Sequence, residues 1–423
     1  MLIIIGAGVA GIGAAFRAKS TGIDYLLLEK SDSVGGLLDN FSIDGFRFDN
    51  AVHLSFATEP EVRELFDRVP YFTHQPESWC FDDGLWLRHP IQNNLYGLDV
   101  ASKVEIIEGF INRPLYGEPE NYQQWLHTQY GYAFCKRFPE RYTQKYWTVS
   151  AEELGVDWVG NRMAQVDLQK VLTGAMTEHT ENAYYAKEMR YPEKGGYKAF
   201  IQPMIDEITI QTNSPVDRID TNNRQVVVNG ISHSYKQLIS TMPLPELIEK
   251  MDNVPEDIQE LARSLYATQV DLVSIGFNCV IETELWFYIY DDDILAARAY
   301  SPSVKSPDNV PEGKSSLQFE IYSSVMSPQI HSPQELQQNC IYAVEKLGIA
   351  EKKDILFTHH KKLPFGNVVF DQGMEERRDR VLEFVRSRNI EVAGRFGEWA
   401  YLWSNQSLLS GFAAVDAMCA RDK

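Results

Sequence analysis

The chain has 423 residues, with 40 Lys and Arg against 59 Asp and Glu, and its formal net charge is −19. At 44% hydrophobic residues it carries enough apolar material for a packed core, which excludes global disorder. The acidic balance argues against nucleic-acid binding, because phosphate backbones need a basic surface. The length allows two or three domains, or one large α/β domain with insertions.

The cysteines and the apolar segments indicate a cytoplasmic protein. The five cysteines are scattered along the chain without a CxxC or Cys/His ligand spacing, so we expect reduced thiols and no metal site. The apolar stretch at residues 1–16 lacks a basic leader and is interrupted by glycines. It therefore predicts neither a signal peptide nor an integral membrane segment.

The first 29 residues have the pattern of a βαβ unit. Residues 2–5 form a short apolar run, as in a buried parallel strand, and the glycine-rich GAGVAG follows at residues 6–11. A helical stretch covers residues 12–20, and a second apolar strand at residues 25–28 ends at Glu29.

Gly6, Gly8 and Gly11 have the spacing of a dinucleotide fingerprint. Such glycines permit a tight turn and a close approach of the backbone to a pyrophosphate, and the following helix offers unpaired N–H groups. Glu29, at the end of the second strand, is placed to accept a hydrogen bond from a ribose hydroxyl. Because this residue is Glu rather than Arg, a 2′-phosphate is disfavoured.

Two further glycines favour FAD over NAD. Gly35 and Gly36 follow Glu29 at the E-x₅-GG spacing of FAD enzymes of the glutathione-reductase-like class. Residues 45–49 then form a hairpin-like run toward the flavin. Near the other end of the chain, a strand at residues 390–392 leads into Gly394 and Arg395 and then a helix, whose N-terminus would favour an anionic reduced flavin.

The remaining patterns predict a discontinuous α/β fold. Residues 101–147 have helical periodicity, and residues 101–188 are expected to form a mainly helical insert. Asn229-Gly230 marks a hairpin turn, and residues 270–300 and 316–324 have the composition of an antiparallel sheet. Amphipathic helices are expected at residues 333–347, 374–388 and 406–420. We therefore predict a Rossmann-like FAD-binding domain (1–95, 189–245 and 375–423), a helical insert (96–188) and an antiparallel β-sheet substrate domain (246–374).

Motifs over nearly the whole chain add a family resemblance. They include GFRFDNAVHLSF at 45–56, HPIQNN at 89–94, WVGNR at 158–162, LWFYIYDDDILAARAYS at 285–301 and GRFGEWAYLWSNQS at 394–407. With these motifs the chain resembles the flavin-dependent UDP-galactopyranose mutases, in particular the longer eukaryotic form. The FAD motifs are shared with amine oxidases and protoporphyrinogen oxidases.

This resemblance implies a redox-neutral isomerisation that requires reduced FAD. In the family, flavin N5 attacks the anomeric carbon of a nucleotide sugar, UDP leaves, and the sugar recloses between pyranose and furanose forms through a flavin–sugar adduct. A nucleotide sugar would be the substrate, and NAD(P)H or another electron donor the reductant. No protein nucleophile is needed, and the sequence shows no Ser/His/Asp or Cys/His signature that would supply one.

The resemblance also assigns residues to roles. His53 matches the histidine over the flavin, and Arg162 and Arg298 match arginines that hold the sugar and diphosphate. The residues implied at the substrate are Gln92, Asn93, Trp147, Arg162, Tyr288, Arg298 and Tyr401. Guanidinium groups suit paired phosphate oxygens, and tyrosine hydroxyls can donate to them.

Three departures from the family pattern leave alternatives open. Val52 stands where the family has Gly before the histidine, Asn367 where it has a phosphate-contacting Tyr, and Thr143 where the longer forms have Asn. The sugar and nucleotide are therefore open. Two other hypotheses stand beside the mutase: a redox flavoenzyme of the amine-oxidase or desaturase type, and a binding protein that has lost its chemistry.

Overall fold

The computed structural model describes residues 1–75, 77–160, 166–178, 180 and 188–421. A five-stranded parallel sheet forms one half of the molecule, in the order β19-β13-β1-β2-β9. Its strands are β1 (Leu2–Ile5), β2 (Tyr25–Leu28), β9 (Ile210–Gln211), β13 (Gln237–Ser240) and β19 (Ile390–Val392). The predicted βαβ unit is thereby confirmed.

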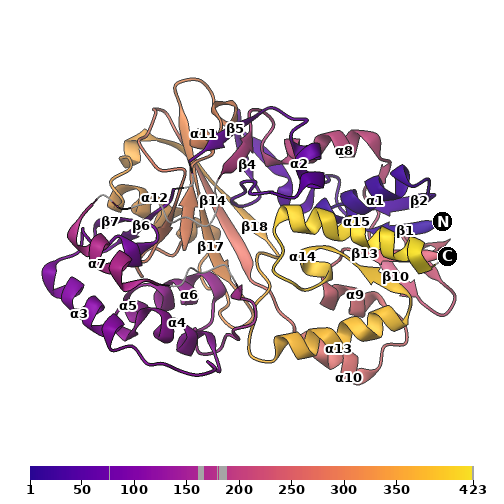
Figure 1. Ribbon diagram of the computed structural model, residues 1–423. Coiled ribbons are helices and arrows are strands. Elements are labelled where there is room, and N and C mark those ends of the chain that lie inside the picture. The colour runs from indigo at the N-terminus through magenta and orange to yellow at the C-terminus, as the bar shows by residue number, and fades with distance from the viewer. Residues whose placement is uncertain (76, 161–165, 179, 181–187, 422–423) are drawn as a thin grey trace.

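Both faces of this sheet are covered, which explains why β1 is entirely apolar. Leu2 and Ile4 pack with α1 (Val9–Ser20) and α15 (Ser404–Arg421), which lie side by side in Figure 1. Ile3 and Ile5 belong to the cluster that contains α9 (Leu244–Lys250), α10 (Glu256–Ser264) and α13 (Met374–Ser387). Successive side chains of a strand point to opposite faces, so a strand between two helical layers needs no polar position.

A seven-stranded sheet forms the centre of the other half, in the order β18-β14-β17-β16-β15-β6-β7. Its strands are β6 (Trp79–Asp82), β7 (Leu85–Arg88), β14 (Gln269–Phe277), β15 (Trp286–Ile289), β16 (Arg298–Tyr300), β17 (Ser315–Ser323) and β18 (Ile355–Leu363). Every pairing in it is antiparallel except that of β6 with β15, which is parallel. Helix α12 (Pro333–Lys346) packs on β14 and β18.

The position of β6 and β7 corrects one sequence prediction. Both strands fall within residues 1–95, predicted as part of the FAD-binding domain, yet they extend the seven-stranded sheet. Each of the two strands is four residues long. Strand β6 pairs with β15, which lies some 200 positions further along the chain, and a local sequence pattern cannot predict such a pairing. The remaining domain boundaries stay a prediction.

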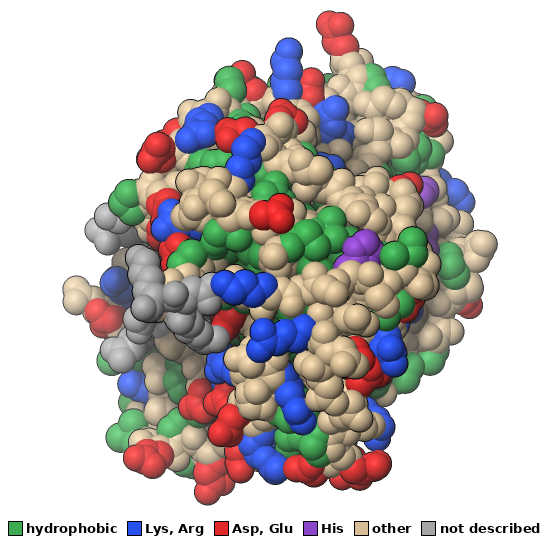
Figure 2. Space-filling view, turned by 90° about the vertical axis from the view of Figure 1, so that its right-hand side faces the viewer, with side chains coloured by type: hydrophobic (Ala, Val, Ile, Leu, Met, Phe, Trp, Pro, Cys, Tyr) green, Lys and Arg blue, Asp and Glu red, His purple; other side chains and the backbone are tan. Residues whose placement is uncertain are grey.

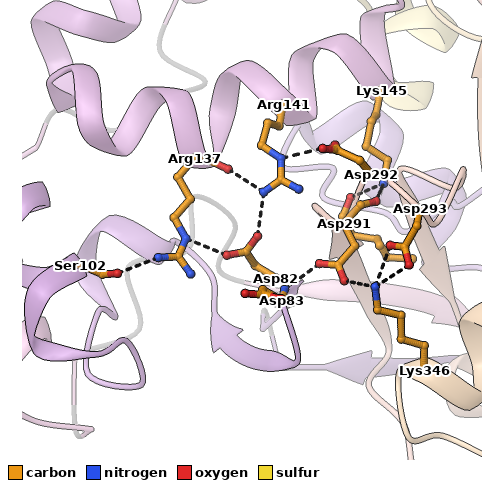
Figure 3. A network of polar contacts seen from close by, with 11 residues as sticks. Asp82, Asp83, Ser102, Arg137, Arg141, Lys145, Asp291, Asp292, Asp293 and Lys346 are labelled. Atoms are coloured by element: carbon orange, nitrogen blue, oxygen red, sulfur yellow. Dashed lines mark hydrogen bonds and ion pairs between the residues drawn. The ribbon is translucent and has the colours of Figure 1, made fainter.

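The predicted helical segment contains α3 (Val100–Ile111), α4 (Tyr122–Tyr130), α5 (Tyr132–Arg137), α6 (Pro139–Trp147) and α7 (Leu168–Met176). Figure 1 shows it beside the seven-stranded sheet, on the side away from both termini. Charged side chains tie this segment to the sheet (Figure 3). Arg137 and Arg141 both donate to the buried carboxylate of Asp82, at 2.8 and 3.0 Å, and Lys145 donates to the carbonyl oxygens of Ile289 and Asp291.

Two predicted hairpins are confirmed. The Asn229-Gly230 turn joins β11 (Gln225–Val228) to β12 (Ile231–Ser234), and both turn residues have positive φ, as a type I′ turn requires. Asp44 and Gly45 make the same kind of turn between β3 (Asn40–Ile43) and β4 (Phe46–Asp49). The second hairpin delivers the chain to residues 50–53.

Shorter elements complete the described structure. They are α2 (Pro60–Phe66), β5 (Tyr71–His74), β8 (Met189–Pro192), α8 (Gln202–Glu207), β10 (Val216–Asp220), α11 (Pro302–Lys305) and α14 (Gly394–Gly397). None of the helices within the described ranges is long and apolar enough to cross a membrane. On the face drawn in Figure 2, acidic and basic side chains are interspersed rather than separated into one basic surface.

Candidate functional site

A cavity of about 850 Å³ is lined by both halves of the molecule. From the parallel-sheet half it takes the end of β1, the start of α1, residues 35–38 and 50–54, and the first turn of α15. From the other half it takes residues of β15, β16 and β17 and of the segment 363–367. The predicted site residues that line it are Gly6, Gly8, Glu29, Gly35, Gly36, His53, Tyr288, Arg298, Gly394, Arg395 and Tyr401.

The glycine turn before α1 leaves room for a ligand at one glycine and none at another. A Cβ on Gly8 would meet no atom within 4 Å, and Gly8 has an ordinary φ of −73°. A Cβ on Gly11 would lie 1.8 Å from the carbonyl oxygen of Gly6. No side chain caps the first turn of α1, so its N–H groups are available to an anion. Gly8 therefore forms open cavity wall, whereas Gly11 permits close packing of helix on strand.

Glu29 and the paired glycines fit the adenosine end of a dinucleotide. The Glu29 carboxylate accepts from the backbone N–H of Ala7 at 2.8 Å and of Ser31 at 2.9 Å, which fixes its position at the end of β2. Gly35 has φ 110° and donates its N–H to the carbonyl of Ala7 at 2.8 Å. These contacts bring the second glycine motif against the first, as an extended diphosphate requires.

His53 lies in a strained loop at the cavity. Ala51 has φ 76°, a region that favours glycine. The Nδ1 of His53 lies 3.1 Å from the carbonyl oxygen of Ala51, and since a carbonyl only accepts, Nδ1 carries the proton. The ring stacks on Tyr197 at 5.2 Å between centroids. Burial lowers the pKa of His53 to about 4, so the imidazole is neutral at physiological pH.

A buried ion pair lies close to this loop. The ammonium of Lys305, fully buried, is 3.2 Å from the carboxylate of Asp49 and 3.8 Å from the ring centroid of Tyr300. Asp49 also accepts from the hydroxyl of Tyr191 at 2.8 Å and the backbone N–H of Tyr197 at 3.0 Å. Asp49 is thus fully hydrogen-bonded, and it ends the hairpin that delivers the His53 loop.

Arg298 forms an ion pair with a second buried carboxylate. Its Nε donates to Glu320, which has no exposed surface and lies opposite Arg298 on the neighbouring strand. The guanidinium also lies 5.1 Å from the ring centroid of Tyr146. Glu320 further accepts from the hydroxyl of Tyr322 and, at 2.6 Å, from the backbone N–H of Val52. Among the described residues, the hydrogen bond of Arg298 is made by its Nε, and its side chain lines the cavity.

Arg395 is held by neutral partners. Its Nε donates to the carbonyl of Leu402 at 2.9 Å, its NH1 donates to Oδ1 of Asn367 at 3.2 Å, and its guanidinium lies 5.4 Å from the ring centroid of Tyr401. Among the described residues no carboxylate pairs with it. Asn367, only 4% exposed, therefore orients Arg395 rather than projecting freely into the cavity.

Four predicted residues are absent from the cavity wall that the described residues form, and the placement of a fifth is not described. Gly11 is the packing glycine above, and Arg162 lies outside the described residues. Trp147 is 5% exposed and packs behind the wall, 5.8 Å from Tyr401 between ring centroids. Gln92 and Asn93 lie in a 3₁₀ turn that packs against α7. The substrate-binding roles of Gln92, Asn93, Trp147 and Arg162 stay predictions.

The sequence reasoning missed the buried partners of the charged residues: Asp49, Tyr146, Lys305, Glu320 and Tyr322. One signal was available in β17, where Ser316, Gln318, Glu320 and Tyr322 alternate with apolar residues. Such alternation marks one polar face of a strand, although β17 is buried on both faces.

Two protein-family models match the chain. A model described as "NAD(P)-binding Rossmann-like domain" matches residues 4–69, and one described as "Flavin containing amine oxidoreductase" matches residues 109–418, most of the chain. The chain belongs to the flavin-containing amine oxidoreductase family. The structure accordingly is that of a flavoenzyme, with a Rossmann-like dinucleotide-binding part and a sheet-rich second part.

Individual relatives within and around this family differ in their chemistry. A crystal structure of reduced UDP-galactopyranose mutase superposes with a TM-score of 0.94 at 25% identity, covering 99% of this chain and 95% of that one, which confirms the resemblance noted in the sequence. A carotenoid 3,4-desaturase of Haloarcula japonica is 22% identical over 79% of this chain and 78% of its own. Cyclohexylamine oxidase from Brevibacterium oxydans has a TM-score of 0.71 at 15% identity, over 99% of this chain and 98% of its own, and shares the fold.

Proposed function

We propose that the protein is an FAD-dependent nucleotide-sugar mutase that interconverts pyranose and furanose forms, with UDP-galactose as the first substrate to test. The observation that carries this proposal is a set of polar side chains that line one cavity together with the glycine turn. There Arg298 and Arg395 face the same space as Tyr288, Tyr322 and Tyr401. Guanidinium groups and phenolic hydroxyls are donors suited to a diphosphate and a sugar.

The cofactor proposed is FAD, held as in the glutathione-reductase-like class. The open Gly8 turn, Glu29 and Gly35–Gly36 fit its adenosine diphosphate, and the first turn of α15 lines the cavity with Ser404 and Ser407. Reduced FAD, when bound, would supply a nucleophilic nitrogen and regain it unchanged at the end of a redox-neutral cycle. The five cysteines are free thiols, which supports a cytoplasmic location, and NAD(P)H or another electron donor is proposed as the reductant.

The side chains of this chain would bind, orient and hold charge. Arg298 would hold the diphosphate, both while it is attached to the sugar and after it leaves, and Arg395, which the sequence assigns to the cofactor, lines the same cavity. Neutral His53 presents its unprotonated Nε2 as a hydrogen-bond acceptor, since Nδ1 is occupied by the Ala51 carbonyl. The tyrosines Tyr146, Tyr322 and Tyr401 enclose the site; burial raises the pKa of Tyr322 well above its usual value, so its hydroxyl stays protonated.

A flavin oxidoreductase of the desaturase or oxidase type is the second candidate. The likeness to a carotenoid desaturase over most of both chains favours it. The cavity wall weighs against an apolar polyene. A hydrocarbon could not accept hydrogen bonds from those N–H groups of Arg298 and Arg395 that have no partner among the described residues, and burying such groups unpaired is unfavourable.

One experiment separates the two candidates. The purified protein is reduced with dithionite, mixed with a panel of UDP- and dTDP-sugars and treated with cyanoborohydride, and the released flavin is weighed by mass spectrometry. The mutase predicts flavin heavier by one hexose or deoxyhexose. Unmodified flavin across the panel, with bound FAD confirmed, would count against it, and substrate-dependent oxygen consumption would then support the oxidoreductase.

A further inference from the structure

Glu320 connects the two walls of the cavity. It lies on β17, in the seven-stranded sheet, yet its carboxylate accepts from the backbone N–H of Val52, in the loop that carries His53. Its other partners, Arg298 and Tyr322, come from the sheet and line the cavity. The carboxylate thus joins the loop beside the predicted flavin position to the cation predicted to hold the substrate.

Glu320 is also charged in this position. Burial opposes its ionisation, but the charge of Arg298 and the hydrogen bonds from Tyr322, Val52 and Arg298 outweigh burial and hold the pKa of the carboxyl below its usual value. The Arg298–Glu320 pair is therefore neutral overall. A phosphate that approaches Arg298 meets an arginine whose charge is already balanced.

The other charged groups near the site do not replace Glu320. Asp49 is engaged with Lys305 and two hydrogen-bond donors of its own. Arg395 has no carboxylate partner among the described residues, so its charge is not balanced in this way. Glu320 is thus the described carboxylate that both sets the charge of Arg298 and contacts the His53 loop.

We propose that Glu320 is a positioning residue that fixes the guanidinium of Arg298 and the loop carrying His53 together, and that its negative charge limits the attraction of Arg298 for a diphosphate. This inference deepens the proposed function and rests on it for the identity of the ligand. Glu320 lies on β17, outside the dinucleotide fingerprint at residues 6–11.

The test uses the FAD-loaded protein and the variant Glu320→Gln, which keeps an acceptor for the Val52 N–H but removes the charge. The midpoint potential of the bound flavin is measured without ligand, and the dissociation constant of UDP by titration. We expect a more positive potential and UDP binding tightened about fivefold or more, because one negative charge beside the cavity is gone. The matched control is Glu383→Gln, which removes an exposed carboxylate on α13.

A second comparison covers the case in which Glu320→Gln fails to fold with Arg298 buried and unpaired. Arg298→Met is compared with the double variant Arg298→Met/Glu320→Gln, in which no charge is left unpaired. The comparison is made at a pH of about 9, because a buried carboxyl without its cation ionises only at high pH. The potential should be more positive in the double variant. Equal potentials in this comparison, or a Glu320→Gln protein that matches Glu383→Gln in both measurements, would overturn the proposal.

UDP binding by the wild-type protein tests the nucleotide-sugar function, and the flavin potentials of the variants test the role of Glu320. Wild-type protein that binds no UDP would count against the nucleotide-sugar function. The flavin potentials, measured without any nucleotide, would still decide whether Glu320 acts on the flavin side of the cavity.

Discussion

Adding one methyl group at Gly8 or at Gly11 should separate cofactor binding from folding. In Gly8→Ala the new Cβ meets no protein atom within 4 Å, and its backbone φ of −73° and ψ of 179° suit alanine. In Gly11→Ala the new Cβ would lie 1.8 Å from the Gly6 carbonyl oxygen, and α1 must move away from β1. The two changes are chemically identical and lie three residues apart.

The expected magnitudes follow from these distances. Overpacking at Gly11 should destabilise the protein by about 3 kcal/mol, which lowers Tm by roughly 5 °C. At Gly8 the unfolding free energy of the flavin-free protein should change by less than about 1 kcal/mol. The methyl group there would occupy the place proposed for the pyrophosphate, so FAD should bind roughly tenfold to a hundredfold more weakly.

Two assays measure these effects: thermal unfolding of flavin-free protein, and titration with FAD followed by flavin fluorescence. Gly8→Ala with wild-type FAD affinity would refute the assignment of this turn to the dinucleotide. An unchanged Tm in Gly11→Ala would refute the packing argument.

Three further predictions concern the buried charges. Folding lowers the pKa of His53 from 6.5 to about 4, so the folded protein should lose up to about 3 kcal/mol of stability as the pH falls from 6.5 toward 4. In His53→Gln, the free energy of unfolding measured with denaturant should depend less on pH over that range. Lys305→Met should destabilise the protein by about 3 kcal/mol in urea unfolding, and adding Asp49→Asn should restore part of the loss; an additive second loss would contradict the ion pair. Asp82→Asn should lower the free energy of unfolding by about 2 kcal/mol. The loss is limited because Arg137 and Arg141 can turn to solvent, and proteolysis should cut the helical segment faster than in the wild type.

Local pattern was sufficient for much of the architecture. The strand, glycine turn and helix at residues 2–20 form as predicted, because strand burial and the glycine spacing are properties of adjacent residues. The same holds for the Asn229-Gly230 turn, whose two positive φ angles few other residues adopt. The helices at 333–346 and 374–387 also match, since helical periodicity is visible over two or more turns.

The site was predictable only where a motif marks it. Gly8, Glu29 and Gly35 could be placed at the cavity from spacing, and Arg298 from resemblance. The partner of Arg298 could not, because it depends on the register of β16 against β17. The pairing of β6 with β15 in the seven-stranded sheet was not predicted for a related reason: short strands carry no information about a partner distant in the chain.

The sequence by itself determined the dinucleotide turn, the hairpins and the amphipathic helices, since each rests on residues close together in the chain. It also indicated the family resemblance, because each of the scattered motifs is itself a short run of residues. Tertiary structure alone decided which carboxylate balances which cation: Asp49 with Lys305, and Glu320 with Arg298. Charge pairing depends on distance and burial, and both arise only when segments remote in sequence pack against each other. The chemistry available in the cavity is therefore a property of the fold, while the motifs show where to look for it.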